Sequence, residues 1–128
     1  MEELNYEKLD VYRCAMELLA QVHLLLDKLS KGFSHLADQL RRSCLSIPLN
    51  IAEGSGKSSP QERMRFFEIA RASALECSAI INCCITLKLT DKDLLAHIRT
   101  LLFRIVQMLS KLSPKARIAS TPPANDGR

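Results

Sequence analysis

Residues Ser46–Glu62, SIPLNIAEGSGKSSPQE, decide how the chain divides into helices. Before and through their first half, apolar residues recur every three or four positions, which is the period of an amphipathic helix. The Gly-Ser-Gly at residues 54–56 is typical of a helix end. The Ser-Pro-Gln-Glu at residues 59–62 has the form of a capping box with proline at the first helical position. The stretch therefore predicts a junction between two helices.

The same stretch contains Gly-Ser-Gly-Lys-Ser-Ser, which is similar to a nucleotide-binding phosphate loop. Such a loop needs a glycine that is separated from its Gly-Lys pair by four residues. In this chain the required position is Ile51. The loop should also follow a β-strand, whereas here the preceding residues have a helical period. We therefore expect no nucleotide site in this loop and interpret it as a helix end and linker.

Composition favours one helical domain. The 128 residues are 47% hydrophobic, enough to fill one core, whereas aromatic residues make up only 5% and tryptophan is absent. Few aromatics and few glycines argue against β-rich folds, and abundant Leu, Ala, Lys, Arg and Glu favour helix. The five cysteines are odd in number and lie within apolar helical patterns. We expect reduced core cysteines rather than a disulfide framework.

Four segments have the helical period. The predicted helices span about residues 7–29, 35–53, 60–87 and 91–113. Ser34 is expected to cap the second helix and Thr90 the fourth, which Pro114 ends. Short connections between four helices favour an all-α fold, an antiparallel up-and-down four-helix bundle. We expect a single domain over residues 1–113 and a disordered tail over residues 114–128, which lack an apolar period.

The core-facing stripe of each helix follows from the same spacing. For the first helix, which we expect to end at Lys31-Gly32, the predicted stripe is Tyr12, Ala15, Leu19, Val22, Leu26 and Leu29. For the third helix it is Phe66, Ala70, Ser73, Cys77, Ile80, Cys84 and Leu87. The small side chains of Ala70 and Ser73 would let a neighbouring helix approach closely.

One face of the second helix is polar. Its members are Gln39, Arg42, Ser46, Asn50 and Glu53. A solvated surface explains such a face. The alternative is a partly buried network in which Arg42 pairs with Glu53 of a neighbouring copy or with Glu76 on the third helix. Pro48 lies in the same helix and removes one backbone hydrogen bond, which permits a kink.

The core stripe predicted for the second helix is Leu36, Leu40, Cys44, Ile47 and Ile51. The helix also has an apolar strip on a different side. The strip consists of Leu45, Leu49 and Ala52. A helix that is apolar on two sides is either central or shared between subunits, and a bundle of four helices has no central one. We therefore expect self-association through this strip.

Positive charge is concentrated in the later part of the chain. Residues 1–40 carry 4 basic and 7 acidic residues, a net charge of −3, whereas residues 41–128 carry 14 and 7, a net charge of +7. A basic strip follows one side of the fourth helix and its continuation: Arg104, Lys111, Lys115 and Arg117. This strip could contact phosphates without sequence preference, or it could be a solvated surface. Aromatic residues for base stacking are missing from the strip, which disfavours single-strand recognition of that kind.

Catalytic and metal-binding motifs are absent from the sequence. His23, His35 and His97 lie on three different predicted helices, and neither Cys-x-x-Cys nor His-x-x-x-His occurs. Glu53 and Glu76 could act as paired carboxylates if they faced each other, although ion pairing with arginine is the alternative. We expect no metal, no cofactor and no enzymatic activity. With no signal pattern and no apolar run of about 20 residues, we also expect a cytoplasmic protein without membrane contact.

Three segments resemble a known family. They are LDVYRCAMELL, QLRRSCLSIPLNIAEGSGKSS and RFFEIARASALE. Together they are similar to the four-helix-bundle proteins encoded in intervening sequences of bacterial 23S rRNA genes, over about residues 7 to 112. The matching positions are Gln39, Arg42, Ser46, Ile47, Asn50, Ile51, Ala52, Glu53, Gly54, Arg65, Phe66, Ala70, Arg71, Ser73 and Glu76. Ser43 and Ala72 depart from the usual alanine and glycine.

The resemblance implies a left-handed bundle that assembles as a five-fold ring. It also implies kinship with the accessory variability determinants of diversity-generating retroelements, which bind nucleic acid and a reverse transcriptase. No catalytic residue comes with it. We therefore expect a homopentamer that binds RNA or DNA with low sequence specificity, with Arg71, Ser73 and Glu76 joining the polar face of the second helix in assembly. The alternative is an adaptor that docks another protein, for example a reverse transcriptase, without touching nucleic acid.

Overall fold

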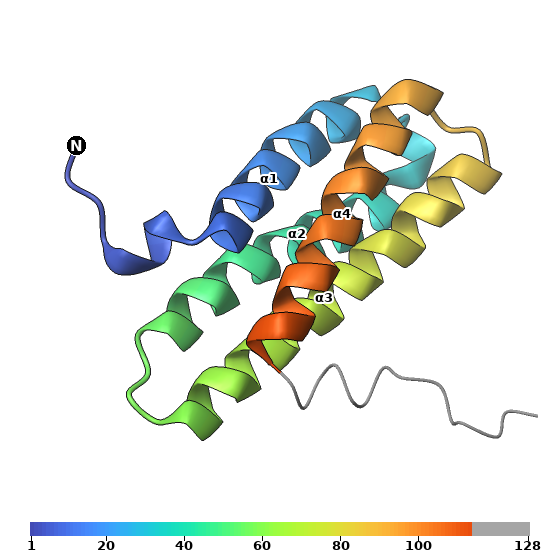
Figure 1. Cartoon of the computed structure of the whole chain (residues 1–128). Helices are drawn as coiled ribbons and strands as arrows, with labels where there is room; N and C mark the ends of the chain where they lie inside the picture. Colours follow the sequence, from blue (N-terminus) through green and yellow to red (C-terminus); the bar gives the residue numbers. More distant parts are fainter. Residues whose placement is uncertain (114–128) are drawn as a thin grey trace, which may run out of the picture.

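The computed structural model describes residues 1–113 of the chain. These residues form two short 3-10 turns and four α-helices, with no strand among them (Figure 1). The elements are η1 Asn5–Lys8, α1 Asp10–Lys28, η2 Lys31–Phe33, α2 Ser34–Ser55, α3 Pro60–Thr86 and α4 Lys92–Leu112. The prediction of an all-α four-helix bundle is confirmed. The predictions for Pro114, Lys115, Arg117 and the tail over residues 114–128 lie outside the described residues.

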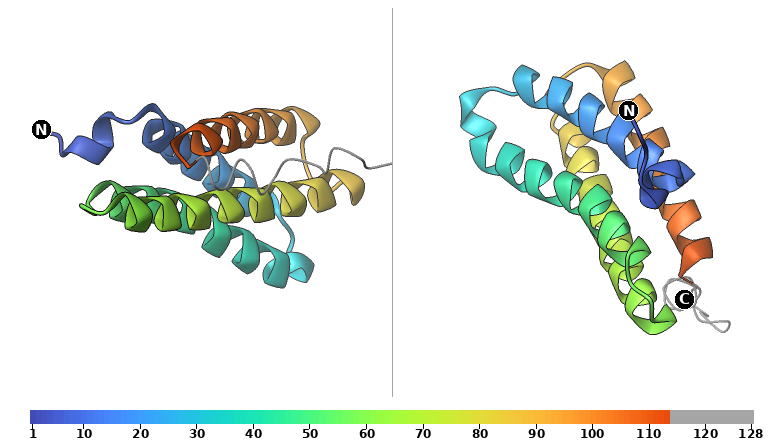
Figure 2. Two further views of the ribbon diagram at one scale, coloured as in Figure 1. Left: turned by 60° about the horizontal axis from the view of Figure 1, so that its bottom comes forward. Right: turned by 90° about the vertical axis from the view of Figure 1, so that its left-hand side faces the viewer.

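The helices enclose one apolar core. Each helix packs on its neighbours in chain order, and α1 also packs on α4, which closes the bundle. The most extensive contact joins α2 and α3. The 3-10 turn η1 lies outside the four-helix arrangement and contacts α1 and α2 (Figure 2). The largest fully buried side chains are Leu18, Leu25, Leu40, Ile47, Ile51, Ile81, Leu95, Ile98, Leu101, Leu102, Ile105 and Leu109. Each such side chain stabilises the fold by about 1.5–3 kcal/mol relative to exposure.

The ends of α1 and α2 differ from the prediction. Residues 5–8 form a separate 3-10 turn, and the extended backbone of Leu9 places the start of α1 at Asp10. The helix then ends before Lys31-Gly32, because Leu29 is already extended. Ser34 does not cap α2: it is the first helical residue and its side chain makes no capping bond.

The fourth helix is capped by a neighbour of the predicted residue. Asp91 Oδ1 accepts the Asp93 N–H at 3.0 Å, so Asp91 rather than Thr90 is the N-cap of α4. A carboxylate at this position satisfies an unpaired backbone donor and also interacts favourably with the positive end of the helix dipole.

The predicted junction between α2 and α3 is present, with one difference. Ser59 Oγ accepts the Glu62 N–H at 3.4 Å and caps α3, and Pro60 is the first helical residue. Gly54, however, lies inside α2, where it faces α3 at very close range. A Cβ atom there would lie 3.0 Å from Phe66 Cβ and 3.0 Å from Phe67 Cε1. Gly54 is therefore a point of close helix contact, and α2 continues past it to Ser55.

By length and composition alone, α3 is long and apolar enough to cross a membrane. Two of its sides pack on α2 and α4. Its core-facing residues are Phe67, Ala70, Ala74, Cys77, Ile81 and Cys84. A core helix of a soluble bundle passes the same test, so α3 is only weak evidence for a membrane span.

Candidate functional site

Polar side chains line the contact between α2 and α3. Ser46 Oγ lies 2.8 Å from Ser73 Oγ across the contact. Asn50 Nδ2 donates to the carbonyl oxygen of Ser46 at 2.8 Å and to its hydroxyl at 3.0 Å. Nearer the start of α2, Gln39 donates to the carboxylate of Glu76. The Ser46–Ser73 and Gln39–Glu76 contacts therefore join two helices of one chain, and Asn50 supports Ser46 from the same helix.

Ser43 completes this set of contacts. Its hydroxyl lies 3.2 Å from Cys77 Sγ and within 3.1 Å of the Gln39 carbonyl oxygen. The neighbouring Cys44 thiol has its pKa raised by a hydrogen bond to Cys77 and by burial, so it stays protonated near neutral pH. We call the whole set the polar seam: Gln39, Ser43, Ser46, Asn50, Ser73, Glu76 and Cys77.

Two members of the predicted polar face do not join the seam. Arg42 donates to Asp38 Oδ2 from Nη2 at 2.9 Å and from Nε at 3.2 Å, one turn back on its own helix. Glu53 Oε2 lies 3.6 Å from Lys57 Nζ. The predicted pairing of Arg42 with Glu76 is therefore wrong within the chain, because Asp38 is nearer on the solvent side of α2.

The paired-carboxylate hypothesis is also wrong within one chain. Glu76 contacts Gln39 near the start of α2, whereas Glu53 lies near the end of that helix. At 1.5 Å per residue, Gln39 and Glu53 are separated by about 21 Å along α2. The two carboxylates thus have different surroundings and cannot share a proton or a metal ion.

Four of the five cysteines are core residues as predicted, and Cys83 is not. Cys14, Cys44, Cys77 and Cys84 are buried, whereas Cys83 is exposed on α3. All five are reduced in the structure. Burial raises the pKa of Cys14 and of Cys84, which favours the unreactive thiol form.

The surface formed by α4 and the adjoining edge of α3 is basic. We call it the basic surface and define it by Arg71, Lys88, Lys92, Arg99, Arg104 and Lys111. Helix α4 carries four of these cations and a single acidic residue, Asp93, in its first turn. Among residues 1–113, none of the six cations pairs with a carboxylate. Arg71 instead donates to Ser110 Oγ at 2.8 Å and links α3 to α4.

An aromatic side chain lies on this surface. Phe103 is 64% exposed, one turn after Arg99 and directly before Arg104. The expectation that stacking aromatics are missing beside the basic strip is therefore wrong. The sequence contained a signal, since Phe103 lies out of phase with the stripe of Leu95, Ile98, Leu102 and Ile105.

The apolar strip faces outward. Leu45 is 44% exposed and Leu49 is 57% exposed, and Ala52 is half-buried. One turn before Leu45, Arg41 borders a groove of about 430 Å³ between α2 and α1. Apolar side chains of α1, including the exposed Met16, form the other wall of this groove. Arg41 therefore separates the apolar wall on α1 from the apolar strip on α2 along this groove.

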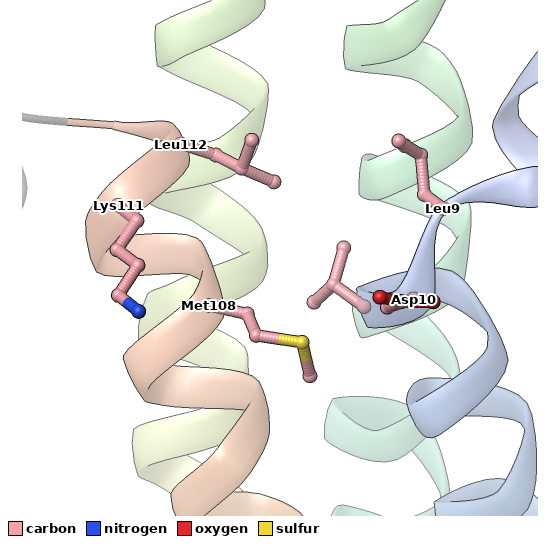
Figure 3. A pocket seen from close by; sticks show the side chains of 6 residues that line it. Leu9, Asp10, Met108, Lys111 and Leu112 are labelled. Atoms are coloured by element: carbon pink, nitrogen blue, oxygen red, sulfur yellow. The ribbon is translucent and has the colours of Figure 1, made fainter.

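A second, smaller groove lies between the start of α1 and the end of α4 (Figure 3). Leu9 on one side and Met108 and Leu112 on the other make it apolar, with Asp10 and Lys111 at its edge. Its volume is about 230 Å³, below that of usual ligand-binding clefts. The groove therefore offers a contact surface and not a small-molecule site.

Fold and surface together define an all-α bundle with a polar helix contact, an exposed apolar strip and a basic side. No group of metal-ligating side chains occurs in the part of the chain that the structure describes. Residues 7–111 match the family described as 23S rRNA-intervening sequence protein, and the chain belongs to that family. The resemblance read from the sequence is thereby confirmed.

Solved structures that are similar in fold include a crystal structure from a Bacteroides species. It is the crystal structure of a protein of unknown function from the S23 ribosomal protein family of Bacteroides thetaiotaomicron. The two share 20% sequence identity and a TM-score of 0.74, over 80% of this chain and 96% of that chain. No curated protein matches the sequence. At this identity the likeness extends to the fold alone.

Proposed function

We propose that the protein is a non-enzymatic, cytoplasmic, self-assembling bundle that binds RNA or DNA through its basic surface with little sequence preference. The observation that carries this proposal is the charge of α4, which has Lys92, Arg99, Arg104 and Lys111 against one acidic residue. Cations without acidic partners can contact a phosphate backbone and release its counterions, which gives sequence-independent affinity.

Phe103 supports single-stranded nucleic acid as one target. An exposed aromatic ring flanked by arginines offers a stacking platform beside phosphate contacts, and stacking accepts any base. The burial of such a ring against a base also explains why a large apolar side chain can remain exposed in the unbound protein.

Assembly through the apolar strip is the second part of the proposal. Leu45 and Leu49 expose apolar area that the bundle itself does not use. A neighbouring copy would cover it, and we propose the five-fold ring that the family resemblance implies. A ring also repeats the basic surface, so several weak phosphate contacts on one strand would add to a high overall affinity.

Titration of fluorescent RNA and DNA oligonucleotides across a salt series tests the nucleic-acid proposal. The logarithm of the binding constant should fall linearly with the logarithm of salt concentration, in both single-stranded and duplex probes. Absence of binding at low salt, or binding that salt does not weaken, would remove nucleic acid as the ligand.

An adaptor that docks an acidic protein surface is the second candidate. The exposed Leu75 on α3 and Phe103 on α4 favour it, because apolar anchors among cations also suit a protein partner. If no oligonucleotide binds although light scattering shows an assembled ring, the adaptor function is favoured over nucleic-acid binding.

A further inference from the structure

The turn between α3 and α4 lies at the other end of α3 from its junction with α2 (Figure 1). Residues on both sides of this turn line a pocket. Its volume is about 570 Å³, which is in the range of ligand-binding clefts. The residues that line it are Ile85, Lys88, Thr90, Lys92, Leu95, Ala96 and Arg99. It is distinct from the polar seam and from the apolar strip.

Three lining residues are cations: Lys88, Lys92 and Arg99. No carboxylate lines the pocket, and within residues 1–113 none of the three forms an ion pair. The nearby Asp91 accepts the Asp93 N–H at 3.0 Å as the cap of α4. Three positive charges around one hollow repel one another and favour a ligand with more than one negative charge.

Lys88 has φ 53°, a left-handed conformation that a lysine rarely adopts. It closes the C-terminus of α3: the Leu89 N–H donates to the Cys84 carbonyl at 3.1 Å, in a helix-ending motif usually formed by glycine. Glycine would fit this position without strain, but it would remove an ammonium group from the pocket. A strained residue whose side chain lines a pocket is a reason to look for a ligand there.

The rest of the wall is apolar. Leu95 is buried, and Ala96 and the partly exposed Ile85 line the pocket beside it. An apolar wall next to clustered cations fits an anion that carries a flat, weakly polar body. A nucleotide has this chemistry, with a phosphate at one end and a base at the other.

We propose that this pocket binds a nucleoside monophosphate group, with its phosphate among the three cations and its base against the apolar wall. The group is either a free nucleotide or the terminal nucleotide of a strand, and the second case rests on the proposed nucleic-acid function. A terminal phosphate carries a charge of about −1.5 to −2 near neutral pH, whereas an internal phosphodiester carries one negative charge. The pocket therefore favours a phosphorylated end over the interior of a strand.

The test compares one single-stranded RNA sequence with a hydroxyl, a 5′-phosphate or a 3′-phosphate at its ends, in fluorescence anisotropy with the full chain. One of the phosphorylated forms should bind about tenfold more tightly than the hydroxyl form. Arg99→Ala should abolish this preference. Lys88→Gly should abolish it as well and at the same time raise the melting temperature, because glycine relieves the left-handed strain.

Lys111→Ala, at the other end of α4, is the matched control and should weaken all three probes equally. Titration with AMP, followed by NMR shifts of Thr90 and Ala96, separates the two sources: saturation by AMP without any strand preference assigns the pocket to free nucleotides. Equal affinity for all strand ends together with no AMP binding would overturn the inference while the proposed function stands. Loss of all oligonucleotide binding at low salt would instead overturn the proposed function.

Discussion

The Ser46 hydroxyl on α2 lies 2.8 Å from the Ser73 hydroxyl on α3, and Asn50 donates to the same Ser46 oxygen at 3.0 Å. Each hydroxyl is only partly exposed, so water cannot fully replace a missing partner. The polar seam thus fixes the register of the most extensive helix contact of the bundle.

Replacement of one hydroxyl of this pair should lower the free energy of unfolding by more than half of the loss caused by replacing both. In Ser46→Ala the Ser73 hydroxyl loses its partner, and in Ser73→Ala the Ser46 hydroxyl keeps only its bond from Asn50. We expect each change to lower the free energy of unfolding by about 1 kcal/mol. The double variant should be less destabilised than the two single effects added together, because no unpaired group remains. Urea denaturation of the four proteins gives the coupling energy. Additive effects would mean that the two hydroxyls do not interact in solution.

Gly54→Ala should destabilise the bundle by about 1–3 kcal/mol, since the new methyl group would contact the Phe66 Cβ and the Phe67 ring at 3.0 Å. Phe66 Cβ is close to the backbone, so relief requires a shift of α3 itself. Gly56→Ala is the matched control: its nearest contact would be 3.6 Å, and the φ of −84° is open to alanine. Thermal melts that show equal stability for the two variants would contradict the close helix contact at Gly54.

Leu49→Asp should dissociate the assembly without loss of helix, because it places an unpaired charge on the apolar strip. Light scattering measures the particle mass, and circular dichroism measures the helix content. Leu24→Asp is a suitable control, since Leu24 is similarly exposed at 50% but lies on α1 outside the α1–α2 groove. An unchanged mass in Leu49→Asp would exclude the strip from the interface.

Much of the fold could be predicted, and the error in the core stripe of α1 has a clear physical origin. In α1 the predicted stripe contained Tyr12, Leu19 and Leu26, whereas the core takes Val11, Leu18 and Leu25, one position earlier. Leucines occupy both sets of positions, so spacing alone permits two stripes. Only the packing of α2 and α4 against α1 selects one of them.

The same ambiguity limits the candidate site. The polar face of α2 could be read from its spacing, because hydrogen-bonding side chains there recur once per turn. Which partner each side chain finds depends on the position of another helix: Ser73, predicted as part of the core stripe, is half-buried and faces Ser46 instead. Lys88 follows the end of α3 and Arg99 lies within α4, and the turn between these helices brings them to one pocket.

Thiol chemistry should distinguish one cysteine from the other four. Cys83 is exposed, so the native protein should react with a maleimide at one site, and all five thiols should react after unfolding. The raised pKa values of Cys14 and Cys84 mean that folding favours their protonated form. Their contribution to stability is therefore present below about pH 8.5, the usual pKa of cysteine, and is lost as the pH rises above it. Mass spectrometry counts the labelled sites; a second label on the native chain would contradict the burial.

The basic surface should control nucleic-acid affinity through charge number. Reversal of Arg104 and Lys111 to glutamate should weaken binding to duplex and single strand alike and lower the salt slope by about one for each phosphate that the variant no longer binds. Lys28→Glu and Lys31→Glu change the net charge equally but lie at the turn between α1 and α2, so they should leave the slope nearly unchanged.

Phe103→Ala should weaken single-strand binding by about 1–3 kcal/mol and spare the duplex, whose bases are already stacked. Equal losses in all these variants would mean that net charge alone, and not the surface of α4, attracts the nucleic acid.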